Sequence, residues 1–159
     1  MDMAPMPWWN LGLRLLAAVV LGAAVGWNRE RADKPAGIKT HILVCLGAAV
    51  VMLTGINIYL HYPDAASGMD PSRMAAHVIS GVGFLGAGTI IHAEGGLVRG
   101  LTTAASVWAV AAVGLACGMG FFLLAGIATV LLVFTLALVN RLLPATKVAR
   151  DAKPKRGTK

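Results

Sequence analysis

Two short polar segments lie between apolar stretches of this chain, and their side chains could bind charged groups. The first, WNRERADKPAGIKTH (27–41), mixes basic residues with carboxylates, and the second, RGLTT (99–103), adds an arginine and two hydroxyls. A charge near hydrocarbon needs a partner, so Arg99 is the expected counter-ion of Glu30. The pattern predicts one polar site that forms a binding surface for a partner protein. The alternative is that these charges only set the orientation of the chain in the membrane. Its six residues are Arg29, Glu30, Lys34, Arg99, Thr102 and Thr103.

A second polar set begins a later apolar stretch. The motif DPS (70–72) is typical of a helix start, because it puts a carboxylate at the N-cap and proline at the first helical position. Arg73 could pair with Asp70 or with a lipid phosphate, and His77 lies one turn deeper on the same face. Asp70, Arg73 and His77 form the predicted outer site. Arg14, in the first stretch, is expected to extend its guanidinium to the lipid headgroups.

Four glycines follow within GVGFLGAG (81–88). The spacing GxGxxG occurs in dinucleotide-binding turns, but those need a strand before the glycines and a helix after them, whereas these glycines lie inside an apolar stretch. Small residues let membrane helices approach closely, so Ala76, Ser80, Gly83 and Ala87 predict one smooth face for another helix. The alternative is a locally broken helix that lines a polar cavity. The residues assigned to packing or to such a cavity are Ser80, Gly81, Gly83, Gly86 and Gly88.

Close packing of that face predicts the relative cost of two substitutions. Gly83→Leu would force two backbones apart, whereas Leu136→Ala would only trim a side chain expected to face lipid. We therefore expect Gly83→Leu to disrupt folding or assembly more than Leu136→Ala.

The elements that must position these residues are membrane helices. The chain of 159 residues is 57% hydrophobic and only 13% charged, which is too few charges to cover a water-exposed surface. A spanning helix needs roughly 20 mostly apolar residues. Five stretches qualify and predict an all-α bundle of about five transmembrane helices over residues 1–144: about 9–27, 38–60, 73–92, 101–117 and 121–140.

The basic residues predict how the bundle is oriented, because short loops rich in lysine and arginine stay in the cytoplasm. They flank the first loop and follow the last stretch, which places the N-terminus outside and the C-terminus inside. The tail 145–159 is expected to be basic, disordered and cytoplasmic. The net charge of +7 is mostly this asymmetry, so no nucleic-acid partner is expected.

Acidic residues are confined to loops and helix ends, and this favours one class of function over another. Ion-coupled transporters usually place carboxylates at mid-membrane. The sequence has no HExxH, no serine nucleophile elbow and no paired carboxylates, so we expect no enzyme, cofactor or resident metal. The favoured function is a regulator that packs its helices against another membrane protein or itself. The alternative is a small transporter or channel for magnesium or another cation.

Three segments in order and spacing resemble the MgtC/SapB family over about residues 10–140: KPAGIKTHILVCLGAA (34–49), DPSRMAAHVISGVGFLGAG (70–88) and RGLTTAASVWAVAAVGLACGMG (99–120). The resemblance implies a multi-pass protein of the bacterial inner membrane, tied to growth in low magnesium and to virulence. Asn28 departs from the family pattern, which often has a carboxylate there. We also expect this chain to lack the ACT-like C-terminal domain of the family's better-known members.

Overall fold

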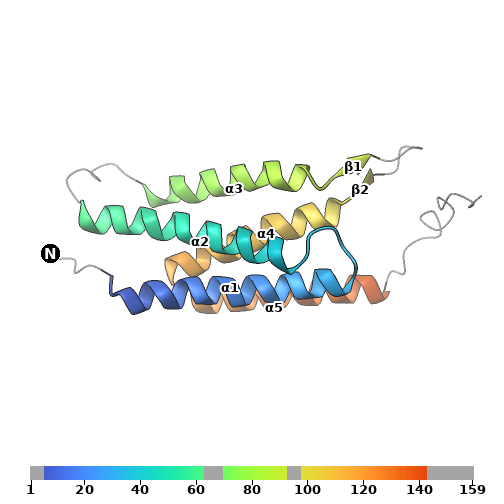
Figure 1. Ribbon diagram of the computed structural model, residues 1–159, viewed down its shortest axis with the longest axis horizontal. Helices are drawn as coiled ribbons and strands as arrows, with labels where there is room; N and C mark the ends of the chain where they lie inside the picture. The colour runs from blue at the N-terminus through green and yellow to red at the C-terminus, as the bar shows by residue number, and fades with distance from the viewer. Residues whose placement is uncertain (1–5, 63–69, 93–97, 143–159) are drawn as a thin grey trace, which may run out of the picture.

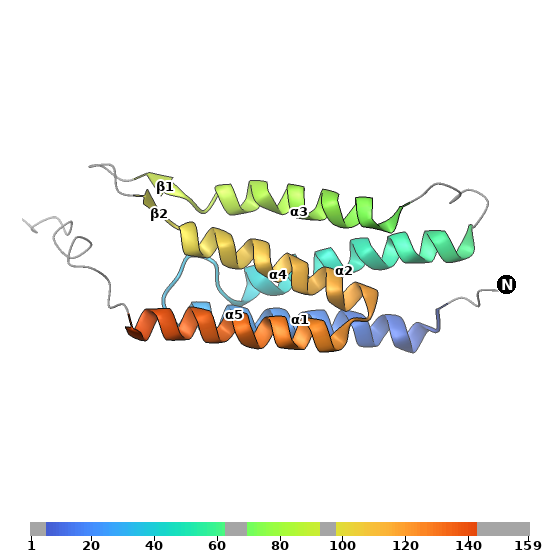
Figure 2. The same ribbon diagram turned by 180° about the vertical axis from the view of Figure 1, so that it is seen from behind.

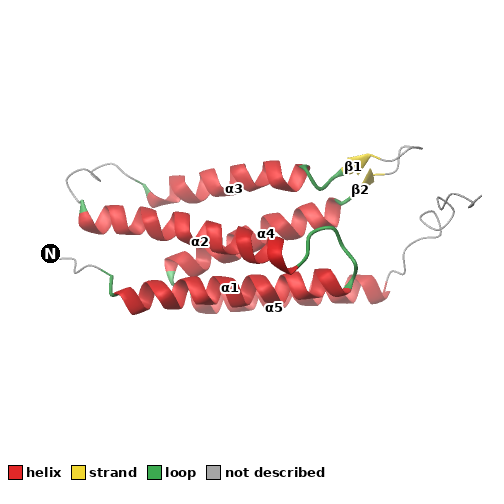
Figure 3. Cartoon of the chain, in the orientation of Figure 1, coloured by secondary structure: helices red, strands yellow, loops and turns green. Residues whose placement is uncertain are grey.

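The computed structural model describes residues 6–62, 70–92 and 98–142, with side chains up to residue 138. Within these ranges the chain forms five helices: α1 (Trp8–Arg31), α2 (Ile38–His61), α3 (Pro71–Ala87), α4 (Leu101–Met119) and α5 (Phe122–Leu142). Each helix runs opposite to the one before it (Figures 1 and 3). The predicted all-α five-helix bundle is confirmed.

The connections alternate between the two ends of the bundle. One end, here called the hairpin end, carries the α1–α2 loop and a small antiparallel pair of strands, β1 (Ile91–His92) and β2 (Val98–Arg99), together with the last turns of α5. The opposite end carries the start of α1, the end of α2 and the turn between α4 and α5. The two predicted polar sites therefore lie at different ends of the molecule.

The third helix ends earlier than predicted. Residues 88–92 were expected to be helical, but α3 ends at Ala87 and residues 91–92 pair with 98–99 as a two-stranded sheet. A turn ends the helix, because the amide and hydroxyl of Thr89 both bond to the carbonyl of Gly86, at 3.0 and 2.8 Å. Through Ser80 to Ala87 the backbone is continuous helix, so the predicted alternative of a broken helix is wrong.

Length and composition suit three of these helices for crossing a membrane. They are α1, α2 and α4, and the apolar part of α5 that is described, Phe122–Leu138, is shorter. The outward surface carries large apolar side chains such as Leu43, Leu123 and Val130, which are 67%, 79% and 67% exposed. Such a surface is suited to lipid rather than to water.

Helices α2 and α4 form the centre of the bundle, between α3 on one side and α1 and α5 on the other (Figures 1 and 2). The core between them is built from small buried residues such as Cys45, Ala49 and Val110. Small side chains permit short distances between helix axes, which is the usual way in which membrane helices gain packing contacts.

Two pairs of glycines make these short distances possible. On α1, a Cβ on Gly22 would lie 2.9 Å from the carbonyl oxygen of His41, and a Cβ on Gly26 would lie 2.5 Å from the Cα of Ile38. On α4, a Cβ on Gly114 would collide with the carbonyl oxygen of Cys45, and one on Gly118 would lie 2.8 Å from that of Ala49. Each pair has the spacing GxxxG, a sequence signal that our interpretation did not use.

The glycines of α3 behave differently from the prediction. Gly81 and Gly83 are exposed, and a Cβ on either would meet nothing within 4 Å. Only Gly86 is buried, with the Cβ position 3.6 Å from the Cβ of Ala104 on α4. Leu136, expected to face lipid, is 9% exposed and belongs to the core. Gly83 is therefore not packed against a described helix of its own chain and Leu136 does not face lipid, so both reasons given for the predicted order of the two substitutions are wrong.

Candidate functional site

Four buried polar side chains form a connected group at the hairpin end: Arg29, His41, Thr103 and Ser106. Arg29 Nη2 donates to Thr103 Oγ1 at 2.9 Å and so joins α1 to α4. His41 Nε2 lies 3.1 Å from Ser106 Oγ and joins α2 to α4. Buried polar groups are costly unless they are paired, so these contacts specify how the three helices meet.

The proton positions in this group are linked. Gly37 O can only accept, so His41 Nδ1, at 2.8 Å from it, carries a proton. Ser106 has one hydroxyl proton and lies within reach of both the Thr103 carbonyl, at 2.8 Å, and His41 Nε2. A neutral His41 accepts that proton at Nε2, whereas a charged His41 donates and leaves Ser106 to bond to Thr103.

Glu30 has a different role from the predicted pairing with Arg99. Its Oε2 accepts a hydrogen bond from the backbone N–H of Ile38 at 2.8 Å, next to Gly37, the N-cap residue of α2. A carboxylate at this position satisfies a free amide and complements the positive end of the α2 dipole. Among the described residues, Glu30 therefore fixes the α1–α2 loop rather than joining it to α4.

A cavity of about 620 Å³ lies beside the buried group, between the α1–α2 loop and the start of α4. It brings together Arg29, Lys34, Arg99, Thr102 and Thr103 of the predicted inner site, and Glu30 lies outside it. In the described part of the chain, three of the lining side chains are cationic and one is a carboxylate. The described residues that line it are Arg29, Asp33, Lys34, Pro35, Val98, Arg99, Gly100, Leu101, Thr102 and Thr103.

The predicted outer residues begin α3 at the opposite end. Asp70 Oδ1 accepts from the Ser72 amide at 2.8 Å and Oδ2 from the Ser72 hydroxyl at 2.6 Å, so the carboxylate is the N-cap. These hydrogen bonds lower the pKa of Asp70, and the charge of Arg73 adds a smaller effect in the same direction. Arg73 and His77 are exposed. The cap is therefore present at neutral pH and is lost as acid protonates Asp70.

Arg14 points into the bundle instead of reaching for the headgroups. Its Nε donates to Asn10 Oδ1 and its Nη1 to the carbonyl oxygen of Gly118, both at 2.7 Å. That carbonyl belongs to the last turn of α4, where free carbonyl groups and the negative end of the helix dipole favour a cation. Arg14 thus joins α1 to the C-terminal end of α4.

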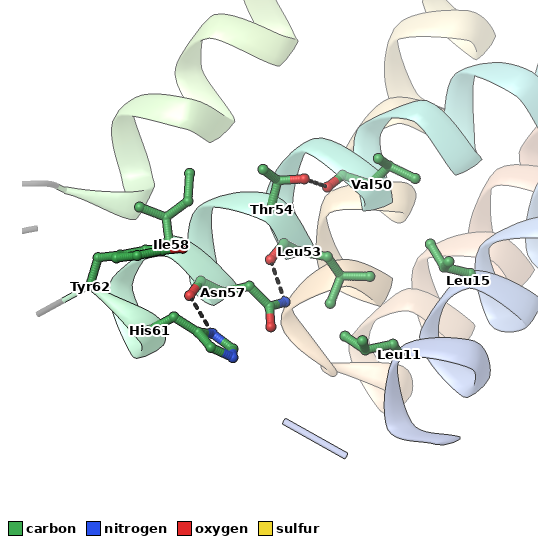
Figure 4. A pocket seen from close by; sticks show the side chains of 9 residues that line it. All are labelled: Leu11, Leu15, Val50, Leu53, Thr54, Asn57, Ile58, His61 and Tyr62. Atoms are coloured by element: carbon green, nitrogen blue, oxygen red, sulfur yellow. Dashed lines mark hydrogen bonds between the residues drawn. The ribbon is translucent and has the colours of Figure 1, made fainter. Parts of the chain in front are cut away.

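A groove of about 440 Å³ separates α1 from α2 at the opposite end (Figure 4). The polar side chains along it bond to their own helix: Asn57 donates to the Leu53 carbonyl at 2.8 Å, and His61 Nδ1 to the Asn57 carbonyl at 2.9 Å. The groove therefore offers mainly apolar surface. Over residues 6–62, 70–92 and 98–138, no group of three or more His, Cys, Asp or Glu side chains is arranged to hold a metal ion.

The apolar outer surface, the small-residue core and the helix-joining polar group define a helical-bundle protein of the membrane. The model of the MgtC family matches residues 15–144. The chain belongs to this family, as its sequence motifs predicted. No solved structure matches the chain.

Three relatives show how far the similarity extends. Protein MgtC of Salmonella typhimurium is 45% identical over 120 residues, 76% of this chain and 48% of the relative. Protein SapB of Bacillus subtilis is 40% identical over 111 residues, 69% and 48% of the two chains. "Putative magnesium transporter YhiD" of Escherichia coli is 38% identical over 134 residues, 82% and 60% of the two. The chain thus spans about half the length of the curated relatives it matches.

Proposed function

We propose that this protein is a non-enzymatic component of the bacterial inner membrane that regulates another membrane protein, in adaptation to magnesium limitation or in virulence. The observation that carries the proposal is the outward face of α3. Ala76, Ser80, Gly83 and Ala87 are spaced as one stripe along the helix, and all four are exposed. The family membership supports a role related to that of MgtC.

This face differs from the other outward surfaces of the bundle. Where α2 and α5 present large side chains such as Leu43 and Val130, the stripe on α3 presents small residues and the hydroxyl of Ser80. The large side chain of Phe84, which is 82% exposed, lies next to the stripe. Small residues and hydroxyls in a bilayer are enriched where helices contact each other. The stripe is therefore the surface that best suits a transmembrane helix of a partner protein.

The test places a thiol on the stripe in cells. Ser80→Cys should form a cross-link to a second membrane protein, because the partner helix would lie within reach. Cys45 and Cys117 are fully buried and should not compete for the reagent. Val130→Cys on α5 is the matched control, because it is exposed on a face of large residues.

A second test introduces a large side chain on the same stripe and measures growth in low magnesium. Gly83→Phe should abolish growth in low magnesium while the protein accumulates normally, since Gly83 is exposed and a Cβ there would meet nothing within 4 Å. If Ser80→Cys formed cross-links only to a second copy of this chain, the stripe would be a self-association surface and not the binding site of another protein. Equal cross-linking from Ser80→Cys and Val130→Cys, with normal growth of Gly83→Phe, would remove the basis for the proposal.

Transport of magnesium or another cation is the second candidate, and the name of one relative, "Putative magnesium transporter YhiD", favours it. Purified protein in proteoliposomes would then carry a cation flux above that of empty vesicles. Our first proposal expects none.

The proposed orientation rests on the basic residues of the hairpin end, which include Arg29, Arg31, Lys34 and Lys39. We expect the N-terminus in the periplasm and the C-terminus in the cytoplasm. A reporter that is active only in the periplasm should be silent when fused to the C-terminus, and activity there would contradict this orientation.

A further inference from the structure

The cavity at the hairpin end contains a buried cation with unused hydrogen-bonding capacity. Arg29 is 1% exposed, and its Nη2 donates to the neutral hydroxyl of Thr103. Its Nε has no hydrogen-bond partner among the described residues. A buried guanidinium without an anionic partner is costly, because its desolvation is not compensated.

The surroundings of Arg29 increase the positive potential. Lys34 and Arg99 also line the cavity, and Asp33 is the one carboxylate among the described residues that line it. Thr103 is the third residue of α4, so the guanidinium lies beside the positive end of the α4 dipole. Like charges would repel there unless an anion lies among them.

The backbone at the start of α4 offers further donors. The N-cap is Gly100, which has no side chain to cap the helix, and the first turn contains no acidic residue. The first helical hydrogen bond runs from the Ala104 amide to the Gly100 carbonyl, at 2.8 Å. The amides of residues 101–103 precede that bond and form the kind of helix N-terminus that binds oxyanions.

We infer that this cavity is a binding site for a phosphate group, with the buried guanidinium of Arg29 as its central ligand. Lys34 and Arg99 are cations at its exposed rim, and Thr102 adds a hydroxyl. A guanidinium fork and helix amides match the oxygens of a phosphate. The volume of about 620 Å³ accommodates a phosphorylated small molecule or a phospholipid headgroup. This inference does not depend on the proposed partner of α3.

The first experiment titrates inorganic phosphate into the purified full chain in a phosphate-free maltoside detergent. We expect the unfolding temperature to rise with phosphate, and not with chloride at the same ionic strength. Because Arg29 also holds Thr103, the rim residues carry the mutational test. Arg99→Gln and Lys34→Gln should each weaken phosphate binding about tenfold. Lys39→Gln removes an exposed charge at the same end, outside the cavity, and should bind normally.

Nanodiscs of defined lipid then identify the source of the phosphate. Stabilisation by inorganic phosphate in detergent and in nanodiscs indicates a soluble phosphate compound. Stabilisation in detergent alone, with a phospholipid retained in native mass spectrometry by the wild type and lost by Arg99→Gln, indicates a headgroup. Either result supports the site.

Three results would overturn the inference. The first is no stabilisation in either medium together with no retained lipid. The second is equal weakening by Arg99→Gln, Lys34→Gln and Lys39→Gln, which would show only attraction to a basic surface. The third concerns Glu94, which lies outside the described residues: phosphate binding that appears only in Glu94→Gln would mean that the chain supplies its own anion.

Discussion

Gly114→Leu is expected to prevent the bundle from folding. A Cβ at this position would collide with the carbonyl oxygen of Cys45 and lie 2.9 Å from the Cβ of Ala48. Both obstacles belong to the central helix α2, whose backbone cannot move without disturbing its contacts with α1 and α3. We expect a loss of at least about 3 kcal/mol in the free energy of unfolding, seen as low abundance and an aggregated profile in detergent chromatography.

Gly83→Leu is the matched control, because it makes the same change on a helix face where a Cβ meets nothing within 4 Å. The purified single chain should tolerate it with little change in unfolding temperature. If Gly114→Leu were as stable as Gly83→Leu, the tight packing of α4 on α2 would be incorrect. If Gly83→Leu alone failed to fold, α3 would pack through its small-residue stripe within the chain.

Thr103→Val is expected to lower the free energy of unfolding by about 1.5–3 kcal/mol. Valine keeps the shape of threonine but leaves Nη2 of the buried Arg29 without an acceptor. Thr102→Val, one residue earlier and exposed, should have almost no effect on stability. Thermal unfolding in detergent measures both.

A double-mutant cycle separates this hydrogen bond from general packing. In the Thr103→Val background, Arg29→Met should cost clearly less than it does in the wild type, because the hydrogen bond has already been removed. Additive effects would show that Arg29 and Thr103 act independently. Such a result would contradict the joining of α1 to α4 through this pair.

The spans were predictable because they depend on length and apolar composition, which are local properties. The partners of each helix were not, since one sequence does not show which face meets which neighbour. We predicted close helix packing at α3 because its glycines are dense, yet a Cβ on Gly83 would meet nothing within 4 Å. The glycines that lie against the backbone of a neighbouring helix are instead Gly22, Gly26 and Gly114. Their GxxxG spacing was a readable signal. The strands at 91–92 and 98–99 are too short to have a period.

Only part of the inner site could be predicted, because one sequence does not show which helix faces meet. The prediction placed Arg29 and Thr103 in one inner site, and the two side chains are hydrogen-bonded to each other. The predicted partner of Glu30, Arg99, was wrong. A carboxylate accepts a hydrogen bond from a backbone amide as readily as from an arginine, and Glu30 accepts one from the Ile38 amide. The six predicted residues also left out His41 and Ser106, whose pairing needs the rotation of α2 and α4.

Arg14 and Arg29 contact the two ends of α4, and the spacing of these contacts has a mechanical consequence. The arginines are fifteen residues apart in α1, and Thr103 and Gly118 are fifteen apart in α4, so both intervals measure about 22 Å. The two helices, which run in opposite directions, are therefore joined by a side-chain hydrogen bond near each end. A slide of one turn, about 5.4 Å, would break both contacts at once. We therefore expect α1 and α4 to move together as one unit in any rearrangement of the bundle.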